Sequence, residues 1–159
     1  MAPSSVSHSQ PVVTPGRTLL LVSNALYGIG GFMADFSDTH ILNPRWPPHA
    51  KFHNGQTMTL ALFLSLSSLY YLYRPTSSAA QARDSVTVSA LIAAMYCAAG
   101  LAAIWYPGTA WLDPEFESGS WVEDRRQLWL FSGVVAGCWG GWWLEMKRLR
   151  EGEGKGKGL

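Results

Sequence analysis

The stretch 43-NPRWPPHAKFHNGQ-56 decides where the first helical run of this chain ends and where the second begins. Three prolines stand in it, and a residue that precedes a proline is driven away from helical backbone angles. A helix that enters this stretch must therefore end before Pro44. Pro47 or Pro48 suits the first turn of a new helix, because the proline ring already holds a helical φ. We expect the second helix to continue to Tyr73.

The chain on both sides of this bend has the composition of a membrane protein. Of its 159 residues, 14% are charged and 13% are aromatic, whereas ordinary globular domains carry roughly 25% charged residues. A bilayer crossing needs about 20 mostly apolar residues, and four stretches qualify. The second is the weakest, since several Ser and Thr residues lower its hydropathy. We therefore expect an all-α fold, a four-helix transmembrane bundle, with spans at about 18–36, 57–73, 86–106 and 128–146.

Lysine and arginine are distributed unevenly between the two sides of this bundle. Arg17, Arg74, Arg83, Lys147, Arg148, Arg150, Lys155 and Lys157 lie on the side of the chain ends, against Arg45, Lys51, Arg125 and Arg126 on the other. Because cytosolic loops carry the positive excess, both termini are expected in the cytosol. We divide the chain into a disordered N-terminal tail (1–16), a membrane domain (17–147) and a basic, glycine-rich C-terminal tail (148–159). The long polar segment before the first apolar run argues against a cleaved signal peptide.

The last five residues, 155-KGKGL-159, match the K-x-K-x-x pattern that retrieves membrane proteins to the endoplasmic reticulum. This signal acts only on a cytosolic C-terminus, which the charge distribution independently predicts. The sequence therefore predicts an integral membrane protein of the endoplasmic reticulum.

Small residues recur at every fourth position in the third and fourth spans. Such stripes mark close helix contacts inside a bilayer, because association there depends on packing. They fit contacts within one bundle or a homodimer seam; the stripes are Ala90, Ala94, Ala98 and Ala102, and Gly133, Gly137 and Gly141. Cys97 and Cys138 fall in mid-span and are expected to pack as small apolar groups.

The second helix is longer than the bilayer core, so its first two turns are expected at or above the lipid boundary. His49 and His53 stand four residues apart on those turns, and hence on one helix face. In the first span, a polar stripe begins at Asn24 and ends in Asp35 at the boundary. An ionisable residue at such a depth is costly unless it has a partner or a function. We predict that Asp35 pairs with His49 or His53, since a carboxylate orients an imidazole and raises its basicity.

The sequence thus nominates a site on the side opposite the termini. Its expected catalytic residues are Asp35, His40, His49 and His53, and its expected ligand-binding residues are Asn24, Asp38, Trp46, Glu115 and Trp121. The last two belong to an acidic loop between the third and fourth spans, which the topology places on the same side. Two alternatives stay open: the polar residues hydrogen-bond the bend to the next helix, and the acidic loop is simply solvated.

Several classes of function have no motif in this chain. It has no glycine-rich phosphate loop, nucleotide fingerprint, G-x-S-x-G elbow or paired C-x-x-C. Three histidines and several acids would suffice for one metal ion, but we assign no metal and no cofactor. We expect membrane lipid and a lipophilic small molecule as partners, and no nucleic acid.

The run from Asp35 to Gly55, DFSDTHILNPRWPPHAKFHNG, resembles the signature of a family of small four-pass membrane proteins that are numerous in filamentous fungi. The pattern is D-x3-T-H-x2-N-P-x-W-P-P-H-A-K-F-H, and it covers about an eighth of the chain. The resemblance implies a fungal origin and a place in secondary-metabolite biosynthesis. It supplies no mechanism.

Taken together, these patterns favour a membrane enzyme that acts by proton transfer on a lipophilic molecule such as a terpenoid or polyketide. An isomerase, a cyclase or a cofactor-free oxidase would each fit. In this interpretation His49 and His53 move protons, Asp35 and His40 orient or charge them, and Trp46 offers a π-face to a flat or cationic intermediate. The alternative is a non-catalytic scaffold or lipophilic-ligand-binding protein. A transporter subunit is disfavoured because the middle of each span lacks charge.

Overall fold

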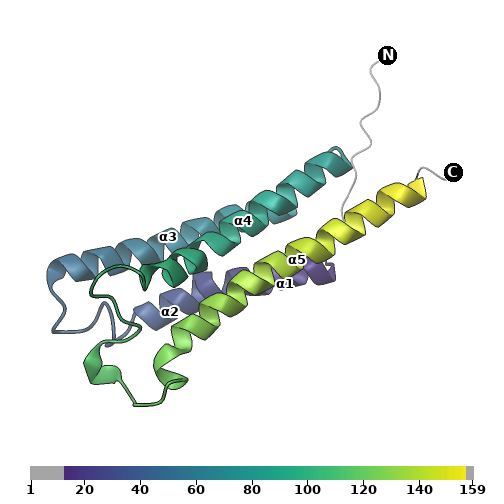
Figure 1. Ribbon diagram of the computed structural model, residues 1–159. Coiled ribbons are helices and arrows are strands. Elements are labelled where there is room, and N and C mark those ends of the chain that lie inside the picture. The colour runs from purple at the N-terminus through teal and green to yellow at the C-terminus, as the bar shows by residue number, and fades with distance from the viewer. Residues whose placement is uncertain (1–12, 157–159) are drawn as a thin grey trace.

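The computed structural model describes residues 13–156, and in this range the chain is all-helical, as predicted. Four long helical units run alternately up and down, with both chain ends at one end of the bundle (Figure 1). The opposite end carries the bend at 36–47 and the long loop at 104–125. Helix α5 packs between α1 and α4, and α3 packs mainly on α4.

The first unit is one helical run with a change of pitch inside it. It consists of α1 (Pro15–Ala25), a π-helical turn η1 (Leu26–Gly30) and α2 (Gly31–Asp35). The Thr14 hydroxyl caps its start by accepting from the Arg17 N–H at 3.1 Å. Phe36 ends it, with φ −83° and ψ 61°.

Helix α3 (Pro48–Tyr73) starts at the second proline of the pair and ends at the residue expected from the sequence. That prediction is confirmed. Helix α4 (Ala79–Ala103) starts seven residues before the expected span, because Ser78 caps it by accepting from the Gln81 N–H at 3.2 Å. It also ends earlier, so Trp105 and Tyr106 lie in the following turn.

Helix α5 (Arg126–Gly156) is longer than the expected span and extends into the segment assigned to the C-terminal tail. An ion pair between Arg83 and Glu153, 2.6 Å from Nη1 to Oε1, ties this extension to α4. Two single turns, η2 (Pro114–Phe116) and η3 (Glu123–Arg125), shape the loop before it. Residues 1–12 of the expected N-terminal tail lie outside the described residues, as do Lys157 and Leu159 of the expected retrieval signal.

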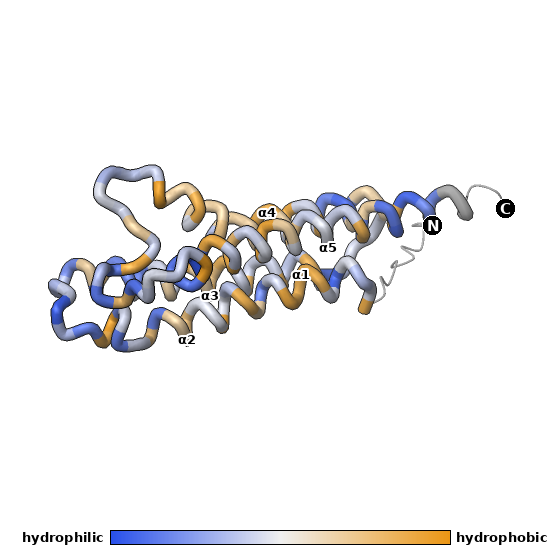
Figure 2. The backbone as a smooth tube through the Cα atoms, turned by 60° about the horizontal axis from the view of Figure 1, so that its bottom comes forward, coloured by the Kyte–Doolittle hydropathy of each residue, from blue (hydrophilic) through white to orange (hydrophobic). Residues whose placement is uncertain are grey.

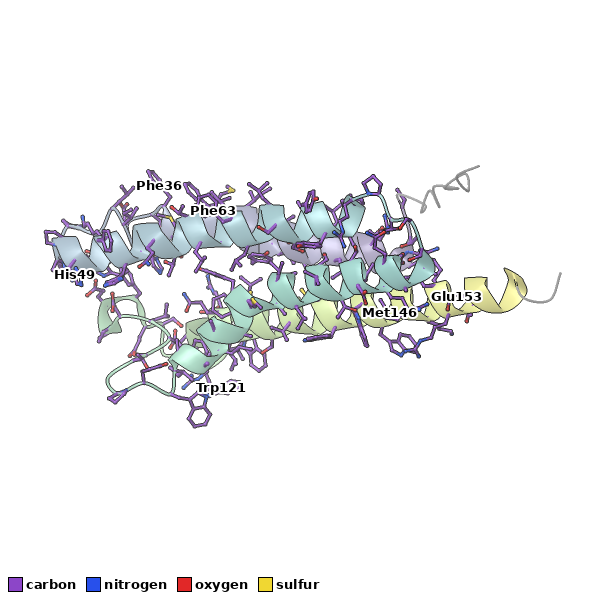
Figure 3. All side chains as sticks on the ribbon, turned by 90° about the horizontal axis from the view of Figure 1, so that it is seen from above. Phe36, His49, Phe63, Trp121, Met146 and Glu153 are labelled. Carbon is purple, nitrogen blue, oxygen red and sulfur yellow. The ribbon has the colours of Figure 1, made fainter. Side chains whose placement is uncertain are left out.

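The bundle has an apolar core that includes Leu20, Tyr27 and Leu72, but it also buries many polar and small side chains and presents large apolar ones outside. On α3 the buried positions include Asn54, Ser65 and Ser68, whereas Phe63 and Leu66 on the outer side are 63% and 64% exposed. Figure 3 shows Phe36 and Phe63 pointing away from the bundle. Figure 2 shows hydrophilic stretches concentrated at the two ends. A water-soluble helix has the opposite arrangement, with its apolar stripe facing the core.

One helix among the described residues, α4, is long and apolar enough to qualify as a membrane span by itself, with a mean hydropathy of 1.9 over its best 18 residues. The four-helix bundle is therefore present. Average hydropathy alone does not show that all four helical units cross a membrane. The other helices carry polar residues on their inner faces, which lower the average without changing the outer surface.

Part of each small-residue stripe serves contacts within the chain. A Cβ at Gly141 would lie 2.8 Å from the Gly16 carbonyl oxygen, and one at Gly137 would lie 2.5 Å from the Ser23 hydroxyl, so α1 and α5 nearly touch. Gly133 has nothing within 4 Å of such a Cβ. In the other stripe Ala90 and Ala94 are buried, but Ala98 and Ala102 are exposed. Cys97 and Cys138 are buried free thiols, as expected.

Candidate functional site

The strongest polar cluster away from the chain ends forms where the first helical unit stops. After Asp35 the chain turns back on itself, with Ile41 N donating to Asp35 O at 3.2 Å and Leu42 N to Ser37 O at 3.0 Å. This turn returns the His40 ring to the end of α2. The His40 Nε2 lies 3.7 Å from Asp35 Oδ1, and the two side chains are 24% and 16% exposed.

A chain of hydroxyl groups orients the His40 ring. The Ser37 hydroxyl donates to Ala34 O at 2.6 Å and lies 2.9 Å from the Thr39 hydroxyl oxygen. The Thr39 oxygen lies 2.8 Å from His40 Nδ1. Because Thr39 engages Nδ1, Nε2 is the ring nitrogen that faces the Asp35 carboxyl. An imidazole beside a carboxyl in a partly buried position is an arrangement suited to acid–base chemistry.

Helix α3 supplies the second partner of Asp35. The Asn54 Nδ2 donates to Asp35 Oδ2 at 3.1 Å, and Asn54 is 8% exposed. The other end of this amide, Oδ1, is buried and has no hydrogen-bond partner among the described residues. A buried acceptor without a donor is costly, so Asn54 is held here at some cost in stability by its bond to Asp35.

The long loop closes over the other side of His40. Trp46 packs edge-on against the His40 ring, with ring centres 5.4 Å apart, and its Nε1 donates to Asp113 Oδ2 at 3.1 Å. Asn43 Nδ2 donates to Glu115 at 3.4 Å, and Arg45 forms an ion pair with the same carboxylate. A cavity of about 170 Å³ lies between His40, Trp46 and this loop. The predicted meeting of the bend with the acidic loop is thus present, through Asp113 and Glu115.

A larger, partly open apolar pocket of about 460 Å³ lies further along the bundle, between α3, α4 and α5. Leu64, Met95 and Phe131 contribute to its wall, and Thr57 and Tyr96 bring its two hydroxyl groups. Thr57 follows Asn54, the partner of Asp35, by about one turn of α3. The pocket therefore begins about one helical turn from the Asp35–His40 pair.

The predicted pairing of Asp35 with His49 or His53 is wrong in this structure. The partners of Asp35 are His40 and Asn54, whereas the Nε2 atoms of His49 and His53 lie 3.0 Å from each other. Both rings are on the exposed side of α3, and Figure 3 shows His49 at the outer tip of that helix. The reason is helical phase: at about 100° per residue, His53 and His49 point about 100° and 140° away from Asn54, the residue that faces Asp35.

The remaining predicted residues are dispersed. Asn24 is fully buried in mid-bundle, where its side chain bonds to Leu20 O, the Ser68 hydroxyl and the Tyr27 hydroxyl. It holds helices together and lies apart from the cluster at Asp35. Asp38 is exposed on the turn. Trp121 is 57% exposed and packs with Trp129 and Arg125 at the outer surface of the loop.

Sequence reasoning missed three residues of this site: Asn54, Thr57 and Tyr96. A signal for Asn54 was present, because the inward stripe of α3 runs through Asn54, Met58, Ala61, Ser65, Ser68 and Leu72 at helical spacing. Tyr96 has no comparable signal, since its neighbours Tyr27, Thr57 and Phe131 come from three other helical units. Within residues 13–156, no group of three or more His, Cys, Asp or Glu side chains converges to hold a metal ion.

The chain matches a protein family of unknown function, DUF6640, over residues 19–155. It belongs to this family. No curated protein and no solved structure matches the chain. The matched residues include Asp35, His40, Asn54 and Tyr96, so the whole candidate site lies inside the match, while the description of DUF6640 assigns it no activity.

Proposed function

We propose that the protein is a multi-pass membrane protein whose four long helical units all cross the bilayer, with both chain ends on the cytosolic side. The distribution of side chains supports this, since large apolar residues cover the outside while polar ones such as Asn24, Asn54 and Ser68 are buried inside. The shortest unit, Pro15 to Asp35, has 21 residues by its three segments, about 31 Å at 1.5 Å per residue and enough for a hydrocarbon core of about 30 Å.

Cysteine labelling from one side of the membrane tests this topology. Single cysteines at exposed Val13, Ala80 and Arg150 are expected to react from the cytosolic side, and one at exposed Glu117 from the other side. Cys97 and Cys138 are buried and give a low background. If only α4 crosses the membrane, the cysteine at Arg150 will instead react from the same side as that at Glu117.

At the site, the proposed function is proton transfer on a lipophilic small molecule that enters the apolar cavity from the membrane. The observation that carries this is the closeness of the two along α3: Asn54 bonds to Asp35, and Thr57, about one helical turn later, lines the pocket. The Asp35–His40 pair lies in a partly buried position, where a general acid or base is effective. An apolar pocket with a few convergent polar groups is the usual form of a small-molecule site.

The chemistry that fits the pair is isomerisation or cyclisation. In either reaction the protonated His40 delivers a proton from Nε2 to one atom of the substrate, and the resulting pair of neutral imidazole and carboxylate accepts a proton from another atom. No net proton, electron or cofactor is consumed. A cofactor-free oxidation would need dioxygen as the oxidant in addition to this proton transfer.

Substitution of the pair tests this function. Asp35→Asn and His40→Gln are expected to abolish product formation, measured by metabolite profiling of strains that carry each variant, while protein abundance falls less. Asp38→Asn is the matched control, because Asp38 lies on the same turn and is exposed. A precursor that accumulates in the Asp35→Asn strain and in a strain without the gene would identify the substrate. Unchanged metabolites in both strains would contradict the proposal.

The second candidate function is a binding or scaffold protein without turnover. It is favoured by one observation: both Asp35 oxygens have protein partners, as in a purely structural link between the bend and α3. In that case Asp35→Asn lowers abundance and thermal stability in proportion to any loss of function.

Residence in the endoplasmic reticulum, and a role in fungal secondary-metabolite biosynthesis, belong to the same proposal and rest on sequence patterns. Replacement of Lys155 and Lys157 by alanine is expected to move a fluorescently tagged protein out of the reticulum. Retention of the double variant there would contradict the retrieval signal, without affecting the site.

A further inference from the structure

The first two turns of α3 carry a pair of histidines at the outer end of the bundle. His49 and His53 are exposed, and their Nε2 atoms lie 3.0 Å from each other. The ring centres are 4.5 Å apart, and the ring planes make an angle of 81°. The two imidazoles therefore meet through their Nε2 atoms at the surface of the helix.

The other nitrogen of the His53 ring has a partner on the same helix. His53 Nδ1 lies 3.2 Å from the side-chain oxygen of Gln56. Because an amide oxygen only accepts, this contact is a hydrogen bond when Nδ1 carries the proton, which leaves the lone pair on Nε2. A histidine that binds a metal ion almost always donates its other N–H in this way, to a carboxylate, a carbonyl or water.

The separation of the two Nε2 atoms matches two neighbouring ligands of one metal ion. Imidazole nitrogens bind Zn²⁺ at about 2.0–2.1 Å, so two of them would lie about 2.9 Å apart at a ligand angle of about 90°, and about 3.3 Å apart at a tetrahedral angle. The 3.0 Å between the Nε2 atoms is close to the first value. A ligand angle near 90° belongs to square-planar and tetragonal sites, which Cu²⁺ and Ni²⁺ form with nitrogen and oxygen ligands.

The helix and the ring of Phe52 restrict the two imidazoles. The spacing of four residues brings both side chains to one helix face. Phe52 lies parallel to the His49 ring, with ring centres 6.1 Å apart and an interplanar angle of 8°, and it meets the His53 ring edge-on at 5.5 Å. Less side-chain freedom is then lost when an ion binds, which favours binding.

From this geometry we propose that His49 and His53 form a surface site for a divalent transition metal ion, with Cu²⁺ bound most tightly because it leads the affinity order for such ligands. The two Nε2 atoms are neighbouring ligands, and water takes the other positions, since both rings are exposed. The ion replaces the proton between the Nε2 atoms, and this proton moves through solvent to His49 Nδ1. The site is separate from the proposed function, because the partners of Asp35 are His40 and Asn54.

Copper binding by the full-length protein in detergent, near neutral pH, tests this site. The chain has four histidines, so every protein in the test carries His8→Gln and has no polyhistidine tag. Cu²⁺ alone is titrated by isothermal titration calorimetry, and electron spin-echo envelope modulation counts the imidazoles on the bound ion. In this background we expect two imidazoles on one ion. His49→Gln and His53→Gln should each lower the affinity at least about tenfold, a loss of about 1.4 kcal/mol or more.

Two further variants distinguish a chelate from two exposed imidazoles that bind independently. His49→Gln combined with Lys51→His keeps the number of histidines, but residues 51 and 53 point about 200° apart around the helix, so tight binding should not return. Gln56→Ala removes the partner of His53 Nδ1 and should weaken binding about tenfold or more.

Two imidazoles on the ion, with a loss of affinity in both single variants and in the combined variant, support the chelate. A single imidazole on the ion in the His8→Gln background, no binding, or equal affinity in that background and in the single variants overturns the metal site and leaves only a hydrogen bond between the rings. The proposed function at Asp35 and His40 stands or falls separately, by the metabolite profiles.

Discussion

The Nε atom of Arg17 lies 3.3 Å from Oε1 of Glu145, and the two side chains are only 6% and 1% exposed. The Thr14 hydroxyl donates to the other carboxylate oxygen at 2.7 Å, and Arg148 Nη2 donates to Oε1 at 2.6 Å. This buried network joins the first turn of α1 to α5 at the end of the bundle opposite the candidate site. It leaves the carboxylate with donors on both oxygens, which a buried charge requires.

Glu145→Gln is expected to destabilise the protein by about 3 kcal/mol, because it leaves the buried Arg17 without its counter-ion. Thermal unfolding of the purified protein in detergent measures this. Glu151→Gln, at an exposed position on the same helix, is the control and should unfold at the wild-type temperature. Equal unfolding temperatures for both variants would show that the network contributes little.

Gly141→Ala should separate α1 from α5. The added Cβ would lie 2.8 Å from Gly16 O and 2.9 Å from Leu20 Cγ, and overpacking of this kind costs about 1–3 kcal/mol. Gly133→Ala adds the same methyl group to the same helix where nothing lies within 4 Å. It should be neutral or slightly stabilising, since alanine favours helix over glycine.

Gly141→Ala and Gly133→Ala also test whether the glycine stripe forms a homodimer contact, the alternative that the sequence left open. If Gly133→Ala lowers the apparent mass of the detergent complex in multi-angle light scattering, a second chain contacts that residue. If only Gly141→Ala has an effect, and that effect is on unfolding, the stripe acts within one chain.

His49→Gln and His53→Gln should leave stability within about 0.5 kcal/mol of wild type, as exposed substitutions usually do. Because both rings lie on the exposed side of α3 and Asp35 bonds elsewhere, we also expect metabolite conversion to continue in both variants. Loss of conversion at normal abundance in either one would restore the site expected from the sequence and contradict the assignment to Asp35 and His40.

Asp124 gives a pH dependence to the long loop. Its carboxylate accepts from the Ser118 N–H and hydroxyl, each at 2.8 Å, and from the Gly119 N–H at 3.1 Å. The backbone bond from Ser118 contributes most to a pKa of Asp124 that is held below its ordinary value of 3.8. A lowered pKa in the folded protein means that this stabilisation is complete above pH 3.8 and disappears as the pH falls through the folded-state value.

Limited proteolysis of the loop measures this effect. An acid-active protease such as pepsin should cleave within the loop more readily as the pH is lowered from 5 to 2 in wild type, beyond the change in the protease's own activity, which a denatured substrate calibrates. Asp124→Asn should give a cleavage rate that does not depend further on pH in this range. Parallel profiles for the two proteins would contradict the role of Asp124.

The helices themselves could be predicted from the sequence because their boundaries depend on adjacent residues. The prolines of the bend end one helix and start α3 at Pro48, as expected, since proline restricts its own φ and the preceding residue. The approach of the bend to the acidic loop also followed from sequence. Successive helices alternate in direction, so the first and third connections of the bundle lie at the same end. The reach of α5 to Gly156 did not, since its glycine-rich composition resembles that of a flexible tail.

The sequence by itself determined four helical units, a sharp bend at 43–48, and the kinds of chemical group available near it. Only the tertiary structure decided which groups meet. His40 rather than His49 or His53 reaches Asp35, because the backbone of the turn folds back and the phase of α3 directs Asn54 inward. Tyr96 lines one pocket with Thr57, and Glu145 finds Arg17 across 128 residues, through packing between helices that are distant in the chain. Local sequence fixes backbone angles within a few residues, whereas these contacts depend on the rotation of each helix about its axis, which is set by all of its neighbours at once.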